Sequence, residues 1–250
     1  LHARPAALFV AKAGGFQADI QVFKADKQAN AKSINQIAML GARQGDEIRI
    51  VAMGEDAAGA LAALRDLAND NFGDRDNLQE SPPALPTAAL AVDDGVMSGI
   101  AASPGIAIGP AVHYKPGLPP VEKYRIDDSP GEWARLEKAI GEAVQEIEQL
   151  QSQAVQQVGQ SEAAIFEAHV LMLQDPELIQ TSRELLFAEQ INAEAAWHTM
   201  ITETAAGYRA LDNAYMQARA SDVEDVGQRV LRNLMAMEPP SLEFVEPSIL

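Results

Sequence analysis

Apolar and polar positions in the first 72 residues switch between a helical and an extended period. Apolar residues recur three and four positions apart after Pro5, after Ser33 and after Asp56, which predicts three helices. Ser33 and Asp56 have side chains that accept hydrogen bonds from the first free N–H groups of a helix, so both are predicted N-caps. Alternation over 20–24 and 48–52 predicts two strands. The pattern therefore predicts a small α+β unit.

This periodicity is lost between residues 74 and 98. The stretch combines three prolines with several acidic residues and has no sustained period, which is typical of a linker. The next stretch, 99–114, is punctuated by glycines between short apolar runs, and it predicts a strand, a turn and a strand. We expect one unit over 1–73, a linker over 74–98 and a second unit over 99–250.

Helical spacing returns from about residue 130 to 235. The apolar stripe of its first part predicts one long helix over 131–158. The residues of this stripe are Trp133, Leu136, Ile140, Val144, Ile147, Leu150, Ala154 and Val158. The turn at Asp175 starts a further helix, Asn192 is the predicted cap of another, and 215–235 predicts the last. The closing FVEPSIL predicts a strand. The long stripe fits a hairpin within the chain or a dimerising coiled coil, and we expect the hairpin.

Composition narrows the class of protein. The net charge is −17, from 19 basic and 36 acidic side chains, and such a charge repels the phosphates of nucleic acids. No stretch reaches the ~20 apolar residues that cross a bilayer, and there is no signal-peptide pattern. The sequence contains no cysteine, which removes disulfides and thiolate metal sites. We expect a cytoplasmic protein with no metal site, no nucleic-acid partner and no membrane insertion.

The opening LHARP places a candidate nucleophile before the first helix. The imidazole of His2 has an ordinary pKa near ~6.5, so a large neutral fraction is able to attack phosphorus at neutral pH. Free N–H groups at the start of the following helix favour a bound anion. Arg4 can add charge-assisted hydrogen bonds to the same anion. Together these features describe a reversible phosphate carrier; the alternative left open by so short a motif is an incidental histidine near a frayed terminus.

Three segments of the first unit carry a family signature: LHARPAALFVAKA, ANAKSINQIAMLGARQGDEI and MGEDAAGALAALRDLA. They resemble HPr, the phosphocarrier of the bacterial phosphotransferase system. The resemblance implies an α+β open-faced sandwich, here without the first strand, which would precede His2. It implies that His2 is phosphorylated on Nδ1 and that Ala3 and Arg4 bind the phosphate.

The same resemblance bears on the helix that begins after Ser33. Some HPr proteins carry a regulatory phosphorylation at this position, and the alternative role of Ser33 is a plain helix cap, which we favour. Asn35 and Gln36 are more polar than the hydrophobic patch that is typical of the family here.

The second unit carries its own signature in GIAASPGIAIG, EAAIFEAHVLMLQDPEL and ARASDVEDVGQRVLRNL. These segments resemble the N-terminal part of Enzyme I, which phosphorylates HPr. The resemblance implies a mainly α-helical hairpin bundle with flanking strands, with an HPr-docking subdomain over about 130–235. The implied docking residues are Ile165, Phe166, His169, Leu171, Met172, Asp175, Tyr215 and Arg219. We assign His169 to contact rather than catalysis, because docking needs shape rather than proton chemistry.

The two resemblances also imply parts that lie outside this sequence. The histidine of Enzyme I that accepts phosphate and its barrel for phosphoenolpyruvate (PEP) would follow residue 250, so we expect an internal piece of a longer chain. HPr joined to part of Enzyme I occurs in multiphosphoryl transfer proteins. One type relays phosphate to fructose permeases, and another is the phosphotransferase subunit of the PEP-dependent dihydroxyacetone kinase. SINQIAML, LANDNFGD and EPSIL resemble the second type more closely.

The function implied by the resemblance is phosphotransfer. His2 would accept phosphate from Enzyme I or HPr and pass it towards a IIA-type domain and the dihydroxyacetone kinase subunits. We expect no cofactor in this chain, because PEP and Mg²⁺ would be used by Enzyme I. Two alternatives stay open: a fragment of the fructose type, and a non-catalytic module that docks an HPr-like domain.

Overall fold

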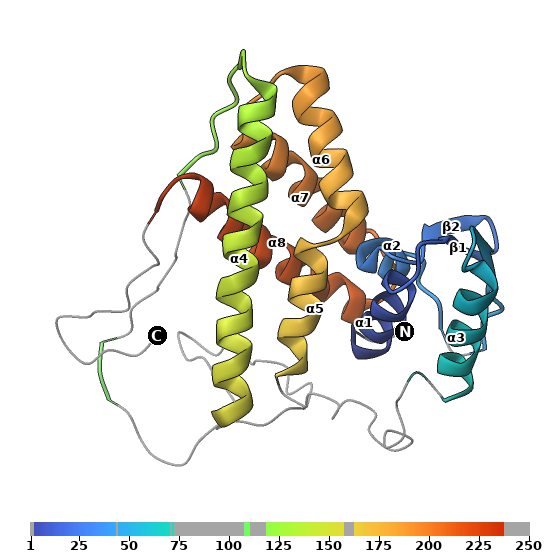
Figure 1. Cartoon of the computed structure of the whole chain (residues 1–250). Helices are drawn as coiled ribbons and strands as arrows, with labels where there is room; N and C mark the ends of the chain where they lie inside the picture. The colour runs from blue at the N-terminus through green and yellow to red at the C-terminus, as the bar shows by residue number, and fades with distance from the viewer. Residues whose placement is uncertain are drawn as a thin grey trace. The chain divides into compact units, whose positions relative to one another are not determined.

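The structure is a computed structural model that describes residues 3–43, 45–70, 72, 108–110, 119–157 and 163–237 (Figure 1). Residues 1–73 and 118–239 form one compact unit. Of the second unit, 74–117 with 240–250, only 108–110 are described. Apart from these three residues, the linker, the strands predicted over 99–114 and the strand predicted in FVEPSIL lie outside the described residues.

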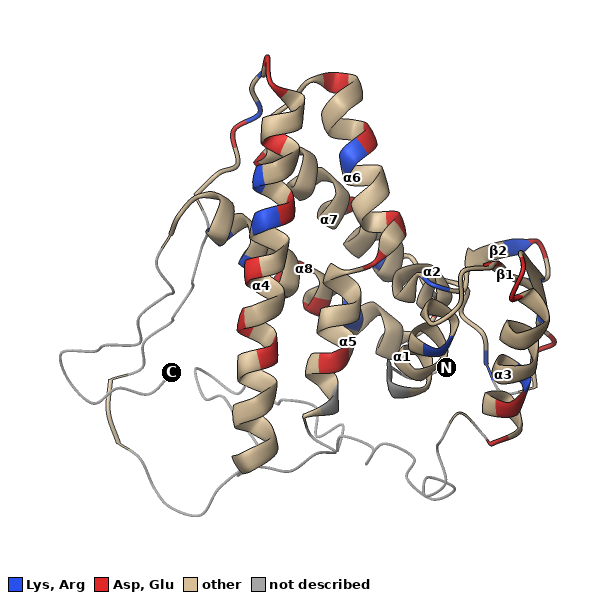
Figure 2. Ribbon diagram, viewed as in Figure 1, with Lys and Arg blue, Asp and Glu red and all other residues tan. Residues whose placement is uncertain are grey.

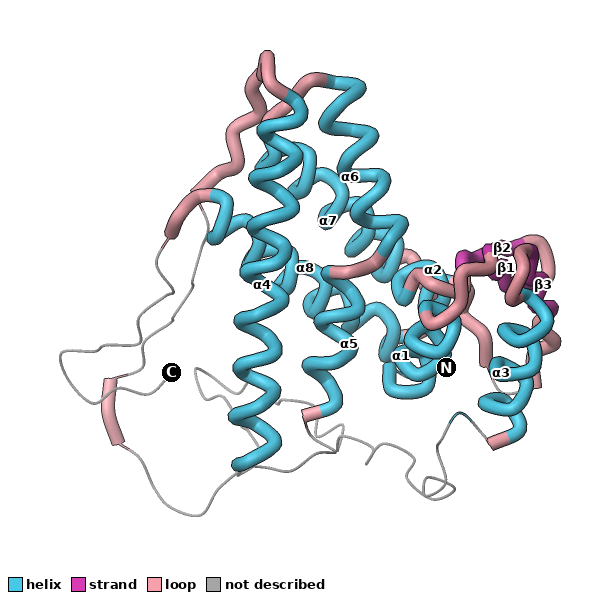
Figure 3. The backbone as a smooth tube through the Cα atoms, in the orientation of Figure 1, coloured by secondary structure: helices cyan, strands magenta, loops and turns pink. Residues whose placement is uncertain are grey.

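The first part of the compact unit is α+β. Its elements are α1 (Ala3–Gly14), β1 (Asp19–Lys24), β2 (Lys27–Asn30), α2 (Ile34–Met39), β3 (Arg49–Met53) and α3 (Ala57–Asn69). The strands form one antiparallel sheet in the order β2-β1-β3 (Figure 3). The three helices and the two strands predicted from the sequence are confirmed. β2 was not predicted, because its sequence KQAN has no apolar alternation.

The core of this part lies between the sheet and its helices. Ile20 and Val22 of β1 are buried on the inner face, and Phe9 of α1 and Leu64 of α3 are buried with them. Each fully buried aliphatic or aromatic side chain contributes about 1.5–3 kcal/mol to the free energy of folding. The alternating strand and the amphipathic helices therefore stabilise one another through this shared core.

The second part of the compact unit is a bundle of long helices. They are α4 (Ser129–Gln157), α5 (Ala164–Leu173), α6 (Pro176–Glu189), α7 (Ala193–Arg209) and α8 (Ala214–Leu234). The stripe of α4 is buried from Leu136 to Ile147, and α4 packs against α5 and α8 of the same chain. This agrees with the expected intramolecular hairpin.

Two of the predicted N-cap side chains do not accept a hydrogen bond from the helix that they precede. Asp56 precedes α3 but makes no cap hydrogen bond; its carboxylate accepts the N–H groups of Gln17 at 2.7 Å and Ala18 at 2.8 Å instead. Asn192 precedes α7 but makes no cap hydrogen bond either; its Oδ1 accepts the N–H of Tyr124 at 3.1 Å. The N–H of Ala193 donates to a Glu132 carboxylate oxygen at 2.9 Å, from the first turn of α4. In both cases the predicted cap side chain bonds to a tertiary neighbour instead of its own helix.

Charged residues are distributed along these helices. Acidic positions recur along α4, α5 and α6, with fewer basic positions among them (Figure 2). Among the described residues, no helix is long and apolar enough to cross a membrane.

Helices α7 and α8 approach closely at Gly227. The indole Nε1 of Trp197 donates to the Gly227 carbonyl at 3.0 Å. A Cβ atom added at Gly227 would lie 2.6 Å from Cγ2 and 2.7 Å from Cγ1 of Ile201, which is itself buried. Because Ile201 is branched at Cβ and has few rotamers, it has little room to move away.

We predict that Gly227→Ala lowers the free energy of unfolding by about 1–2 kcal/mol. Overpacking a core costs about 1–3 kcal/mol, and the better helix propensity of alanine returns at most about 1 kcal/mol. Gly141→Ala in α4 is the matched control, since nothing lies within 4 Å of its added Cβ; it should stabilise by about 0.5–1 kcal/mol. Urea unfolding followed by circular dichroism measures both, and equal effects at the two sites would contradict the close packing.

Candidate functional site

The start of α1 is where the sequence places the phosphate carrier. His2 and the side chains of Ala3 and Arg4 lie outside the described residues, so their roles remain predictions. The described backbone begins the helix at Ala3, directly after His2, and the first turn of α1 contains no acidic residue. The free N–H groups and positive dipole end of that turn favour a negatively charged group.

The helices beside this start are covered by the second part of the chain. α1 and α2 both pack against α5, and α2 also contacts α7 (Figure 1). Among the predicted docking residues on α5, Met172 is buried, and Phe166 and Leu171 are partly buried against the same apolar core. Ile165 is 36% exposed. The structure thus brings the HPr-like part and the helical part into contact within one chain; we call the α2 face with α5, α7 and the turn before α6 the docking interface.

A buried carboxylate lies at the centre of the docking interface. One oxygen of Asp175, Oδ2, accepts hydrogen bonds from the Ser33 hydroxyl at 2.8 Å and from the N–H of Asn35 at 3.0 Å. The other, Oδ1, accepts the N–H groups of Glu177 at 3.0 Å and Leu178 at 3.3 Å, so it caps α6. Asp175 therefore bonds to N–H groups at the start of two helices from opposite sides of the interface.

Ser33 completes this arrangement from the α2 side. Its hydroxyl oxygen accepts the N–H of Gln36 at 3.0 Å, which confirms it as the N-cap of α2, while the same hydroxyl donates to Asp175. The side chains of Ser33 and Asp175 belong to residues that are 0% and 1% exposed. Burial raises the pKa of Asp175 above its ordinary value, and the hydrogen bonds from Asn35, Ser33, Leu178 and Glu177 oppose this rise.

Polar contacts continue outward from this carboxylate. The amide of Asn30 donates to Glu177 Oε1 at 2.7 Å, and the hydroxyl of Tyr208 in α7 donates to Asn35 Oδ1 at 3.1 Å. Farther along α2, the sulfur of Met39 would lie only 3.1 Å from a Cβ added at Gly207. The absence of a side chain at Gly207 thus lets α2 lie close to α7.

Five residues of the docking interface were not among the predicted docking residues: Asn35, Tyr208, Asn30, Glu177 and Gly207. The polarity of Asn35 at a usually hydrophobic position was a signal in the sequence. The other four carried none, since each is an ordinary residue for the helix or strand in which it lies.

The two later docking candidates, Tyr215 and Arg219, lie on α8 beyond the end of α7. Arg219 donates to the Tyr215 hydroxyl at 2.8 Å and to Asp222 Oδ2 at 2.6 Å, and its guanidinium carbon is 4.8 Å from the centre of the Tyr215 ring. Tyr215 is 39% exposed and lines a cavity that it shares with the HPr-like part. Both of these partners of Arg219 lie on its own helix, α8.

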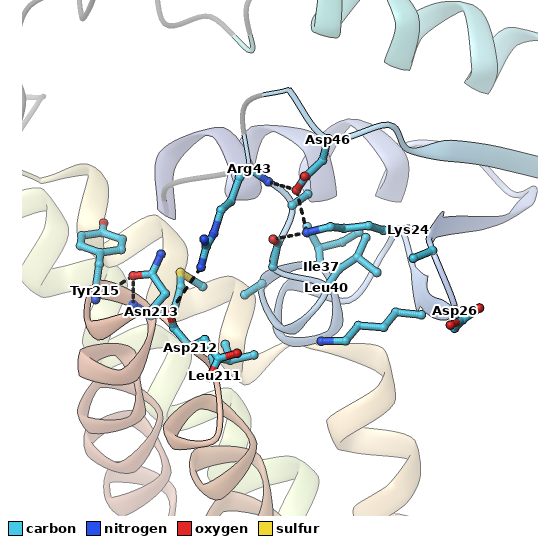
Figure 4. Close-up of a pocket in the computed structure, with 16 residues that line it drawn as sticks. Lys24, Asp26, Ile37, Leu40, Arg43, Asp46, Leu211, Asp212, Asn213 and Tyr215 are labelled. Atoms are coloured by element: carbon cyan, nitrogen blue, oxygen red, sulfur yellow. Dashed lines mark hydrogen bonds and ion pairs between the residues drawn. The ribbon is translucent and has the colours of Figure 1, made fainter.

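The shared cavity has a volume of about 590 Å³ and separates the end of α2 from the α7–α8 turn (Figure 4). Three of its charged residues, Lys24, Asp46 and Arg43, have partners. Lys24 Nζ lies 2.6 Å from Asp46 Oδ2 and donates to the Gly41 carbonyl at 2.6 Å. Arg43 donates to the Asp212 carbonyl at 3.3 Å across the two parts of the chain. The cavity is therefore an edge of the docking interface rather than a separate site.

His169, on α5, is partly buried. Burial lowers its pKa, which favours the neutral imidazole, and its ring meets that of Phe166 edge to face with centroids 6.2 Å apart. Its buried Nε2 has no hydrogen-bond partner within the described ranges. This environment is compatible with a packing role. Across those same ranges, no group of three or more His, Asp or Glu residues is arranged to hold a metal ion.

Comparison with known proteins agrees with this architecture. Residues 1–70 match the family model described as PTS HPr component phosphorylation site, and residues 98–219 match that described as PEP-utilising enzyme, N-terminal. The chain is 33% identical over all its 250 residues to the PEP-dependent dihydroxyacetone kinase, phosphoryl donor subunit DhaM, of Klebsiella michiganensis, and 35% identical to that of Escherichia coli. These alignments cover 100% of this chain and 49% of each relative, so the chain spans about half the length of the curated relatives it matches.

A solved HPr structure is similar to the first part alone. The HPr of Thermoanaerobacter tengcongensis is 49% identical over 30% of this chain and 85% of that chain, with a TM-score of 0.29. The fold and the interface define a class of protein in which an HPr-type α+β domain is joined to a helical Enzyme I-type domain. The chain combines a segment that matches the HPr model with one that matches the PEP-utilising enzyme N-terminal model, and its whole length is homologous to the DhaM subunits.

The buried carboxylate makes a prediction about pH. Because the pKa of Asp175 is raised in the folded state, that state binds the proton more tightly than the unfolded chain. The contribution of this group to stability is therefore largest at low pH, and it falls as pH rises through the interval between the ordinary value of 3.8 and the raised value.

We predict that Asp175→Asn lowers the free energy of unfolding by about 1–3 kcal/mol at about pH 7, because it removes a buried acceptor of several hydrogen bonds. The deficit relative to the unsubstituted chain should grow as pH falls towards about 4, since only the unsubstituted chain gains from protonation. Urea unfolding at a series of pH values measures this difference. A deficit that stays constant or shrinks in acid would refute the raised pKa.

Proposed function

We propose that this chain carries phosphoryl groups on His2 as part of the PEP-dependent phosphotransferase system. The observation that carries the proposal is the position of His2 immediately before the start of α1, within the 1–70 segment that matches the HPr phosphorylation-site family. An imidazole at this place is next to free backbone N–H groups, which stabilise a phosphoryl group electrostatically.

The proposed step is an in-line displacement at phosphorus. The imidazole nitrogen of His2 forms a bond to phosphorus while the bond from phosphorus to the donor histidine of Enzyme I or HPr breaks. The bonding electrons return to the donor imidazole, so no oxidant, reductant or metal in this chain is needed. Arg4 and the N–H groups of the first turn stabilise the charge on the phosphoryl oxygens. The reverse displacement passes the group to the next acceptor.

The homology favours a particular direction for the relay. The relatives matched over the whole chain are phosphoryl donor subunits of PEP-dependent dihydroxyacetone kinase. We therefore propose that phosphate moves from Enzyme I and HPr through His2 to a IIA-type domain and then to the dihydroxyacetone kinase subunits. A relay to a fructose permease is the second candidate; a multiphosphoryl transfer protein of Xanthomonas campestris is 33% identical over 94% of this chain.

The helical part has a proposed role as a dock for the HPr-type part of its own chain. The docking interface, with Asp175 at its centre, supports this role. It also constrains the regulatory alternative, because Ser33 is 0% exposed and its hydroxyl is bonded to Asp175. A kinase would reach Ser33 only after the two parts separate.

We predict that incubation with radiolabelled PEP, Enzyme I and HPr labels this protein with one acid-labile, base-stable phosphate. His2→Ala should abolish the label, because the nucleophile is lost. His198→Ala should retain it, since His198 is an exposed residue on α7 far along the chain from the carrier. Labelling is measured on denaturing gels after mild base and after mild acid.

Two results would refute the relay. One is the absence of label on the unsubstituted protein while HPr itself is labelled, and the other is equal labelling of the His2→Ala variant. Binding of an HPr-like domain without any transfer would favour the non-catalytic docking module instead.

A further inference from the structure

Besides the bond from Ser33 to Asp175, the docking interface contains a second hydrogen bond between two buried side chains from different parts of the chain. Tyr208, in α7, is 1% exposed, and Asn35, the second residue of α2, is 5% exposed. Their sequence positions are 173 residues apart, and the phenol oxygen lies 3.1 Å from the amide oxygen. The phenol both donates and accepts, so either orientation of the amide keeps the bond.

The phenol of Tyr208 depends on this partner. Burial raises the pKa of Tyr208, with the nearby carboxylate of Asp175 adding to the effect, so the hydroxyl stays protonated and acts as a donor. A buried hydroxyl without a partner is costly. Any side chain placed opposite it must therefore offer a hydrogen-bonding group.

The side chain of Asn35 likewise depends on a hydrogen-bonding partner in the helical part. Its backbone N–H is fixed on Asp175 at 3.0 Å, which holds the start of α2 in one place on the helical part. Its amide oxygen meets Tyr208, whereas its Nδ2 atom is buried with no hydrogen-bond partner among the described residues. An apolar side chain would avoid that cost, so a polar residue here is poorly explained by stability alone.

Polar pairs in otherwise apolar interfaces often select the partner rather than add stability. On one side this pair adjoins the Asp175 carboxylate, and elsewhere the interface is apolar, with Met39 close to the backbone of Gly207 and Met172 of α5 buried in the core. Because close packing fixes the position of α2, the side chain at position 35 stays opposite Tyr208.

We propose that Asn35 and Tyr208 form a specificity pair, through which the helical part accepts the HPr-type part of its own chain and rejects HPr-type domains with a hydrocarbon side chain at this position. An apolar residue opposite Tyr208 buries the phenol without a partner. An apolar residue opposite Asn35 does the same to the amide. The pair thus discriminates in both directions and keeps the relay within the chain.

The test uses the whole chain and asks whether the two side chains act as a unit. The variants are Asn35→Leu, Tyr208→Phe and the double variant, each checked for folding by circular dichroism. Amide hydrogen exchange followed by mass spectrometry reads the protection of residues 34–40 and 205–211, because both segments are uncovered together when the parts separate. Asn69→Leu, on the exposed end of α3, and Tyr124→Phe, 51% exposed, are matched controls.

We expect each single substitution to lower protection of both segments by about tenfold, which corresponds to about 1.4 kcal/mol. The double variant should recover to within about threefold of the unsubstituted chain, since replacing both partners by apolar groups removes the unpaired polar atoms. The two controls should leave protection unchanged.

Two outcomes would overturn the specificity pair. In one, the losses multiply in the double variant, which would mean that the residues pack independently. In the other, neither single substitution changes protection, which would mean that the bond does not contribute to docking. Phosphate labelling of His2 in the same variants reports on the relay separately, so failure of one proposal is distinguishable from failure of the other.

Discussion

The arrangement of the compact unit depends on a single carboxylate that serves two helices. Asp175 accepts N–H groups from the start of α6 with one oxygen, and from the start of α2, together with the Ser33 hydroxyl, with the other. The positive dipole ends of both helices favour the charge that burial disfavours. This sharing joins the starts of the two helices through one side chain. The apolar contacts of α2 with α5 and α7 surround this junction.

This geometry bears on the relay in a specific way. α1, whose start adjoins His2, packs against α5 of the helical part. α2 contacts α5 and α7, and Ser33 at its start bonds to Asp175. In the proposed relay, the docked state therefore covers one face of the carrier domain. A different acceptor competes for that face, and the strength of docking sets how often the face is available. A pair such as Asn35 and Tyr208 affects this balance without touching the phosphate.

The local predictions that succeeded were those in which a residue acts on its own helix or strand. Ser33 caps α2, a helix starts after the turn at Asp175, and the alternation of Ile20 and Val22 predicts the inner face of β1. The wrong predictions concerned N-caps whose side chains bond to groups far away in the sequence. Asn192 accepts the N–H of Tyr124, and Asp56 accepts N–H groups from the loop after α1, so neither side chain bonds to its own helix. A four-residue polar strand, β2, gave no period, since it pairs with β1 through backbone groups that every sequence has.

By itself, the sequence determined the periods of the helices and strands, the order of an HPr-like part before a helical part, the family likeness, and the candidate carrier His2 ahead of α1. Only the tertiary structure decided that Asp175 serves Ser33, that Tyr208 faces Asn35, and that Gly207 leaves space for Met39. The physical reason is the separation along the sequence of the residues that interact. Periodicity and capping arise from neighbours a few positions away, whereas these contacts join residues separated by well over a hundred positions, and no local pattern specifies which distant side chain completes a buried hydrogen bond.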